Sequence, residues 1–166
     1  MKISLNAIVI LAFILACGCT SETKTKKQDQ SEQIKSIEQI AEQYLEAWNN
    51  KNINKFDQLT TEDGQYYGSD PEEIMDKAAL LQMYSQFFAD TTTSYLYTVN
   101  LRKIKISSSG KSAVIMERIT FSEWSPKMPM CQTIHLELTD KQWKIDFICW
   151  GFIIKNDDVT KVNEVL

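Results

Sequence analysis

The pattern of apolar and polar positions begins with an unbroken apolar run from Ala7 to Ala16, preceded by Lys2 and followed by Cys17. This run is shorter than the ~20 apolar residues that a membrane-spanning helix needs, and its layout is that of a secretory signal peptide. We therefore expect residues 1–16 to be removed.

The residues around Cys17 carry a second signal. Ile14-Leu15-Ala16-Cys17 resembles the bacterial lipobox, whose Cys is lipidated and becomes the mature N-terminus. Cys19 is a competing site, and an ordinary signal peptide with stray cysteines is the alternative. The three acyl chains that the resemblance implies would make attachment durable, because more than one chain is needed to hold a protein on a membrane. We predict a bacterial cell-envelope protein, lipid-anchored through Cys17 and extracytoplasmic.

The pattern beyond the anchor predicts one folded domain between two polar segments. Residues 20–33 contain no aromatic or aliphatic side chain, so residues 17–33 are predicted to form the lipidated N-terminus and a flexible linker. The folded domain is expected over residues 34–152, a length that suits one domain. Residues 153–166 are expected to form a polar C-terminal extension.

Apolar positions within the domain first recur at three- and four-residue steps, which predicts helices. The expected helices cover residues 32–49, residues 55–59 and residues 71–89, with a short strand at residues 65–67 before the last. The apolar positions are Ile34, Ile37, Ala41, Tyr44, Leu45 and Trp48 in the first helix, and Ile74, Ala78, Leu81, Tyr84 and Phe88 in the third.

From residue 94 onward the pattern alternates with a period of two, which predicts strands. Four strands are expected over residues 94–106, 111–124, 131–138 and 143–154, joined by short turns as in an antiparallel meander. Helices followed by a sheet give an α+β arrangement.

The stretch GSDPEE, residues 68–73, places three carboxylates in four positions. Asp70 suits a helix N-cap, Pro71 the first helical position and Glu73 a capping box, and Glu72 also favours the positive end of the helix dipole. We therefore interpret this cluster as the start of the third helix rather than as a metal or acid–base site.

Composition excludes several classes of function. The formal charge is −4 and becomes −5 once Lys2 is removed with residues 1–16, so no basic surface favours a nucleic-acid partner. Beyond the N-terminal cysteines only Cys131 and Cys149 remain, with a single His and no zinc-ligand spacing. The common nucleotide-binding and hydrolase motifs are missing as well. We predict neither a metal nor a cofactor.

The order of these motifs resembles the SnoaL-like families of the nuclear transport factor 2-like superfamily. The resemblance rests on YLEAWNNKNINKF, GSDPEE after the short strand QYY, KSAVIME and the closing DKQWKIDFICWG. It implies a cone-shaped fold, in which a strongly bent antiparallel sheet wraps the N-terminal helices, and a small-molecule pocket or a dimer surface. Members often end with W-x-I-x-x-x-H-x-S, where this chain has Cys149 and Gly151 at the His and Ser positions.

That departure favours binding over catalysis. We predict a membrane-anchored module that binds a small hydrophobic ligand or a partner protein without turnover. The alternatives are a lyase or isomerase acting on a small hydrophobic molecule in the cone, and a dimeric scaffold. Ligand contacts are expected from Tyr66, Tyr84, Phe88, Tyr97, Glu117, Phe147 and Cys149. Most aromatic residues at such spacings form core, so only a minority of them should touch a pocket.

The last two strands predict which residues face each other across the TDKQ turn. Pairing Leu138 with Trp143 aligns Leu136 with Ile145 and Ile134 with Phe147 on an apolar face, and His135 with Asp146 and Glu137 with Lys144 on the other. We interpret the His–Asp pair as charge matching on solvent or at a subunit contact. The same register places Cys149 inside, opposite Gln132, and Cys131 outside near Trp150, which excludes a disulfide between them.

Glu117 is the one residue we would name as an acid or base if the protein is an enzyme. With Ala113, Ile115, Ile119 and Phe121 facing inward, alternation places Glu117 inside as well, where burial would raise its pKa. With Val114, Met116 and Thr120 inward instead, Glu117 lies outside beside a Lys or Arg, and this second alternative is the one we favour.

Overall fold

The computed structural model describes residues 19–165, with side chains from residue 30 onward. The chain divides into two compact units, residues 1–35 and residues 36–166. The predicted signal peptide and Cys17 lie outside the described residues. In the part of the chain that the structure describes, no helix is long and apolar enough to cross a membrane.

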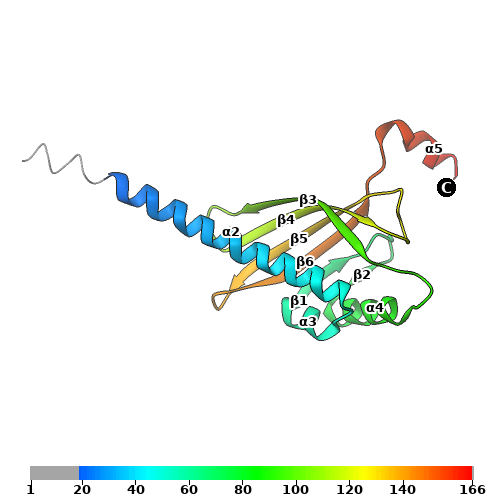
Figure 1. The fold of residues 1–166 in the computed structure, drawn as a ribbon, viewed down its shortest axis with the longest axis horizontal. Helices are drawn as coiled ribbons and strands as arrows, with labels where there is room; N and C mark the ends of the chain where they lie inside the picture. Colours follow the sequence, from blue (N-terminus) through cyan, green and yellow to red (C-terminus); the bar gives the residue numbers. More distant parts are fainter. Residues whose placement is uncertain (1–18, 166) are drawn as a thin grey trace, which may run out of the picture. The chain divides into compact units, whose positions relative to one another are not determined.

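The second unit contains the part of α2 from residue 36 onward, the helices that follow it and one six-stranded sheet (Figure 1). The strands are β1 (Thr60–Tyr67), β2 (Ile74–Met75), β3 (Tyr97–Ile106), β4 (Ser112–Phe121), β5 (Met130–Thr139) and β6 (Gln142–Phe152). The helices are α2 (Cys19–Asn49), α3 (Ile53–Leu59), α4 (Lys77–Ala89) and α5 (Val159–Asn163), with a short 3-10 turn, η1 (Asn156–Asp158), before α5. The predicted α+β class and the helices-then-strands order are confirmed.

The sheet has the order β2-β1-β6-β5-β4-β3 and curls around the helices. Strands β3 to β6 form the predicted antiparallel meander, whereas β1 runs parallel to β6. Helix α2 packs on the inner face through Trp48, whose ring lies 5.2 Å from that of Trp150, and α4 packs there through Tyr84, 6.1 Å from the same ring. One face of the sheet and the helices therefore share a single aromatic core.

Helix α2 begins earlier than the polar pattern predicts. The structure has residues 19–33 in the helix, where we expected a flexible linker. The segment from Thr20 to Asn49 contains neither Gly nor Pro and is rich in Lys, Glu and Gln, which have high helix propensity. The flexible linker was predicted from low hydrophobicity alone, which does not take the helix propensity of these residues into account.

The prediction that GSDPEE starts a helix is wrong. Helix α4 begins at Lys77, and its N-cap is Asp76, whose Oδ1 accepts a hydrogen bond from the backbone N–H of Ala79 at 2.9 Å. Between GSDPEE and this cap, Ile74 and Met75 form strand β2 and pair with β1. Ile74 and Met75 thus extend the sheet as an edge strand. The helix therefore starts six residues later than predicted.

Residues 68–73 instead form a turn, which we call the acidic turn, between β1 and β2. The hydrogen bonds expected of a helix cap are present within it: Glu72 N–H donates to Asp70 Oδ1 at 2.9 Å, and Asp70 N–H donates to Glu73 Oε2 at 3.1 Å. Gly68 is required here, because a Cβ at this position would clash with the Glu73 carboxylate. The hydrogen bonds made by Asp70 and Glu73 were predicted correctly, but they close the β1–β2 hairpin instead of capping a helix.

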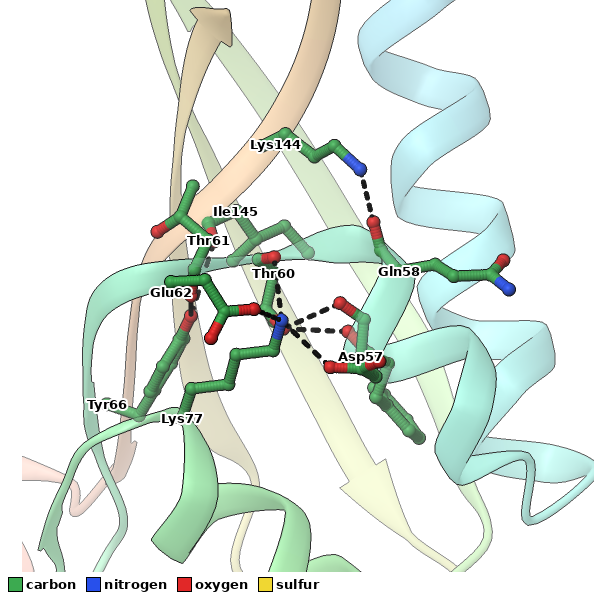
Figure 2. Close-up of polar contacts among 10 residues, drawn as sticks. Asp57, Gln58, Thr60, Thr61, Glu62, Tyr66, Lys77, Lys144 and Ile145 are labelled. Atoms are coloured by element: carbon green, nitrogen blue, oxygen red, sulfur yellow. Dashed lines mark hydrogen bonds and ion pairs between the residues drawn. The ribbon is translucent and has the colours of Figure 1, made fainter.

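A buried ammonium fixes the start of α4 (Figure 2). Lys77 Nζ lies 2.8 Å from Asp57 Oδ1 of α3 and 2.6 Å from Glu62 Oε1 of β1, while its side chain is only 10% exposed. The two carboxylates raise the pKa of Lys77 although its burial acts to lower it. Because this amine stays charged, it anchors α4 to the α3–β1 corner and is a poor nucleophile.

A β-bulge in β6 changes the predicted register. The pairs Leu138–Trp143, Glu137–Lys144 and Leu136–Ile145 are confirmed. Beyond them the register shifts, so that His135 pairs with Phe147 and Ile134 with Ile148. One extra residue in a strand moves every following side chain to the opposite face.

The bulge corrects the placement of two predicted ligand contacts. Phe147 and Cys149 lie on the outer face of the sheet and are half-buried, whereas Trp150 lies inside and is 7% exposed. Cys149 pairs with Thr133 rather than with Gln132. Cys131 and Cys149 are both free, as predicted.

Candidate functional site

An aromatic pocket of about 330 Å³ opens at one end of the core. Its aromatic lining consists of Trp48 of α2, Phe87 of α4, Tyr95, Phe121 of β4, Trp124, and Trp150 and Phe152 of β6. Met83 and four residues of the acidic turn complete it: Ser69, Asp70, Pro71 and Glu73. A concave, mostly apolar cavity with a few polar groups is the usual form of a small-molecule site.

Contacts among the rings hold these walls in place. Trp48 Nε1 donates a hydrogen bond to Tyr95 O at 2.6 Å, which ties α2 to the segment before β3. Tyr95 stacks on Phe87 with ring centroids 4.9 Å apart. Trp124 meets Phe121 edge-on at 5.0 Å, in the edge-to-face arrangement that aromatic pairs favour. Direct contacts between neighbouring side chains therefore fix the positions of the pocket walls.

The carboxylates of the acidic turn are the only acidic groups in the lining, which includes no Lys, Arg or His. The side chains of Asp70 and Glu73 each accept a hydrogen bond from one backbone N–H of the turn. Neither forms an ion pair within the part of the chain that the structure describes. No group of three or more potential metal ligands occurs among the described residues. This pocket wall thus has negative charge available to an occupant.

A polar row crosses the inner face of the sheet next to the pocket. Arg102, Glu117, Gln132 and Trp150 are successive cross-strand partners on β3, β4, β5 and β6. Glu117 is 4% exposed and faces inward together with the apolar positions of β4. The inward placement is thus correct, and the outward alternative that we favoured is wrong. The half-buried Arg102 explains the error, because it supplies on the inner face of the sheet the partner that we expected only outside.

Burial and ion pairing act in opposite directions on Glu117. Its Oε1 lies 2.5 Å from Arg102 Nε, and Arg102 also pairs with Glu42 of α2. Burial raises the pKa of Glu117, the Arg102 charge lowers it, and the net effect is a raised pKa. Glu117 is not part of the pocket lining. Its carboxyl is therefore held by Arg102 within the core.

Three buried polar groups around this row make no hydrogen bond of normal geometry with other described residues, although the Gln132 amide lies near the Tyr97 hydroxyl. They are the side-chain amide of Gln132, the hydroxyl of Tyr97 and the indole N–H of Trp150. A buried polar group without a partner costs about 1–3 kcal/mol. Trp150 also lines the aromatic pocket, although its N–H is closed off from solvent.

All of the predicted ligand contacts lie outside the aromatic pocket. Tyr66, Tyr84 and Tyr97 are closed within the core, and burial raises the pKa of Tyr66 to about 12. Phe88 is half-buried and borders a second cavity of about 390 Å³ beside residues 90–96. Neither these four residues nor Phe147, Cys149 or Glu117 line the aromatic pocket.

Sequence reasoning therefore missed most of the pocket. The signal available was the density of Trp and Phe at the ends of the predicted strands, at Phe121, Trp124, Trp150 and Phe152. Together with GSDPEE, these residues are brought to one end of the core by the fold.

The predicted His–Asp pair is confirmed on the outer face. His135 Nδ1 lies 2.6 Å from Asp146 Oδ1, with the two side chains 31% and 23% exposed. The bulge places Asp146 and Phe147 together opposite His135, so that this pair forms despite the register shift. The pair lies outside the aromatic pocket, as expected for charge matching.

Solved structures define the class of fold. An NTF2-like protein of unknown function from Pseudomonas putida KT2440 matches with a TM-score of 0.61 and 14% identity, over 74% of this chain and 88% of its own. An uncharacterized protein with a cystatin-like fold from Caulobacter vibrioides matches with a TM-score of 0.63 and 12% identity, over 81% and 98%. A "putative ketosteroid isomerase" from Parabacteroides distasonis matches with a TM-score of 0.56 and 16% identity, over 69% and 85%. These likenesses show an NTF2-like cone fold.

The family follows from the sequence. The model of the SnoaL-like domain matches residues 37–148, more than half of the chain. The chain therefore belongs to the SnoaL-like domain family, and the resemblance read from its motifs is confirmed. No curated protein matches the sequence. Since this fold hosts unrelated activities, function has to be argued from the pocket.

Proposed function

We propose that this protein is a lipid-anchored, extracytoplasmic binding protein that holds a small, largely apolar molecule in its aromatic pocket without turning it over. The observation that carries the proposal is the pocket itself, about 330 Å³ in volume and walled by seven aromatic side chains. Neither Glu117 nor His135 lines it: Glu117 is bound to Arg102, and His135 lies on the outer face.

Binding is tested with N-phenyl-1-naphthylamine, a neutral apolar probe whose fluorescence rises in apolar sites. The protein is the chain from residue 17 onward carrying Cys17→Ser, which contains the whole second unit. We expect saturable binding that Trp124→Ala weakens about tenfold, equivalent to about 1.4 kcal/mol of lost contact. Trp124 is 40% exposed, so the fold should tolerate its removal.

The matched control is Met116→Ala. Met116 is 48% exposed on β4 and lies outside the pocket lining. It should leave the probe affinity unchanged within twofold. Equal weakening by both variants, or the absence of saturable binding, would contradict a binding function for this pocket.

Anchoring through Cys17 is supported by the lipobox-like sequence Ile14-Leu15-Ala16-Cys17. In bacterial cells the unaltered protein should sediment with membranes after a salt wash, whereas Cys17→Ser should release it, because the acyl chains provide the attachment. The control is Cys19→Ser, which should stay with the membrane. If the Cys17→Ser protein stays with the membranes and the Cys19→Ser protein is released, the lipidated residue is Cys19 rather than Cys17.

A lyase or isomerase is the second candidate, favoured by the raised pKa of the buried Glu117 carboxyl. A catalytic acid or base has to reach the substrate, within about 3 Å or through one water. This candidate therefore requires Glu117 to leave Arg102 and enter the pocket. A Glu117→Gln variant that binds the apolar probe normally but loses a turnover seen in the unaltered protein would favour it over the binding function.

A further inference from the structure

We infer that the aromatic pocket selects an organic cation, such as a substituted ammonium, which it holds between the aromatic rings and the carboxylates of Asp70 and Glu73. This inference rests on the proposed binding function and specifies the charge of its ligand. It uses the acidic turn, two of whose carboxylates belong to residues that line the pocket.

The charge of the pocket wall is the first argument. Asp70 and Glu73 are the acidic groups in the lining, and no basic side chain lines the pocket to balance them. Within the described residues, one oxygen of each carboxylate accepts a backbone N–H, while the other, Asp70 Oδ2 or Glu73 Oε1, forms no hydrogen bond or ion pair. An anion brought to this wall would be repelled, whereas a cation would find two opposite charges.

The aromatic rings are the second argument. Ring faces carry negative potential and attract cations within about 6 Å of the centroid, most strongly at Trp. Three of the lining residues are Trp: Trp48, Trp124 and Trp150. An apolar pocket without carboxylates would favour a neutral ligand, and carboxylates without rings would favour a hydrated metal ion. The combination of both suits a cation with an apolar surface.

The number of oxygen ligands argues against a metal ion. Calcium and magnesium take about six to eight oxygen ligands, whereas the lining offers two carboxylates, and most of its other residues are aromatic.

The test compares three probes of nearly the same size and shape. Benzyltrimethylammonium carries a positive charge, neopentylbenzene is its neutral isostere, and phenylmethanesulfonate is negatively charged. Binding to the Cys17→Ser chain is followed by tryptophan fluorescence at about 0.15 M salt. We expect the cation to bind about tenfold more tightly than the neutral probe, and the anion to bind most weakly.

Substitutions separate the carboxylates from the rings. Glu73→Gln keeps an acceptor for the Asp70 N–H and should weaken cation binding about threefold, and the double variant Asp70→Asn/Glu73→Gln about tenfold. Neither should change the affinity for the neutral probe. The control is Glu72→Gln, which removes the same charge from the same turn but from a side chain outside the lining, and should change cation binding less than twofold.

The outcomes distinguish this inference from the proposed function. If the neutral probe binds as tightly as the cation and the double variant changes neither affinity, charge selection is wrong while binding of apolar molecules stands. If Glu72→Gln weakens cation binding as much as Glu73→Gln, the attraction is a general effect of the acidic turn and the specific site is wrong. If no probe binds, including N-phenyl-1-naphthylamine, both the inference and the proposed function fail.

Discussion

At the residue scale, Glu117 shows how a single buried charge depends on its partner. Its carboxyl lies in the core, and the side chain of Arg102 beside it is only 17% exposed. A carboxyl whose folded pKa exceeds its unfolded pKa binds more protons in the folded state. The contribution of Glu117 to stability therefore falls as the pH rises from its ordinary pKa of 4.5 through the raised value.

Arg102→Met tests this balance. Removing the cation while keeping an apolar stem leaves a buried carboxylate without its partner, so the free energy of unfolding should fall by about 3 kcal/mol at pH 7. Near pH 4.5 the loss should be smaller, because Glu117 takes up a proton and no charge remains buried. Urea unfolding at both pH values measures the difference.

Lys103→Met provides the control, since Lys103 is the exposed neighbour on the same strand. It should change stability by less than about 0.5 kcal/mol at either pH. An equal loss for Arg102→Met at both pH values would show that packing, rather than charge, explains the effect.

The placement of Glu117 also marks a limit of prediction at this scale. Alternation along β4 allows only two faces, and the apolar residues fit either one. The deciding contact is Arg102, which lies 15 positions away and pairs with Glu117 only once β3 and β4 are aligned. A sequence pattern within one strand cannot provide that information.

At the element scale, the helices and the meander were predictable because apolar residues recur every three to four positions in a helix and every two positions in a strand. The predicted ends of the first two helices, residues 49 and 59, agree with α2 and α3, and each of the four predicted strands corresponds to one observed strand. The start of α4 and the register of β6 were not predictable. The start of α4 was ambiguous because Asp70 and Asp76 can each cap a helix. The register of β6 was missed because a bulge shifts its pairing with β5 by one residue.

The anchoring of α4 by Lys77 leads to a prediction at this scale. Lys77→Met should lower the free energy of unfolding by about 1 kcal/mol or less, because its partners Asp57 and Glu62 are 56% and 88% exposed and water can solvate them. The loss should be much smaller than that of Arg102→Met. The raised pKa of Lys77 means that its contribution is complete at neutral pH and is lost only above about pH 10.5.

Urea unfolding of Lys77→Met beside Lys111→Met, an exposed lysine on the β3–β4 turn, measures this contribution. A loss as large as 3 kcal/mol for Lys77→Met would show that the ammonium is essential to the packing of α4. No loss relative to Lys111→Met would show that the charge of Lys77 does not stabilise the helix.

At the scale of the whole molecule, the fold was far easier to predict than the site. The order of helices and strands in the sequence predicts the cone, because the core needs only the correct period in each element. The pocket needs residues from α2, α4, β4, β6 and three connecting segments to meet at one end. We predicted ligand contacts from apolar positions of the helices and strands, such as Tyr84 and Tyr97. These side chains are buried in the core instead.

The central claim is that the end of the core holds a small apolar molecule, and the indole N–H signals test it most directly. The chain contains four Trp residues, of which Trp48, Trp124 and Trp150 line the pocket, while Trp143 is buried at the start of β6 outside it. In a proton–nitrogen correlation spectrum titrated with N-phenyl-1-naphthylamine, the signals of the three pocket residues should shift in a saturable manner and that of Trp143 should stay in place. If none of the four shifts, or if Trp143 shifts as much as the others, the account of this pocket as the binding site is contradicted.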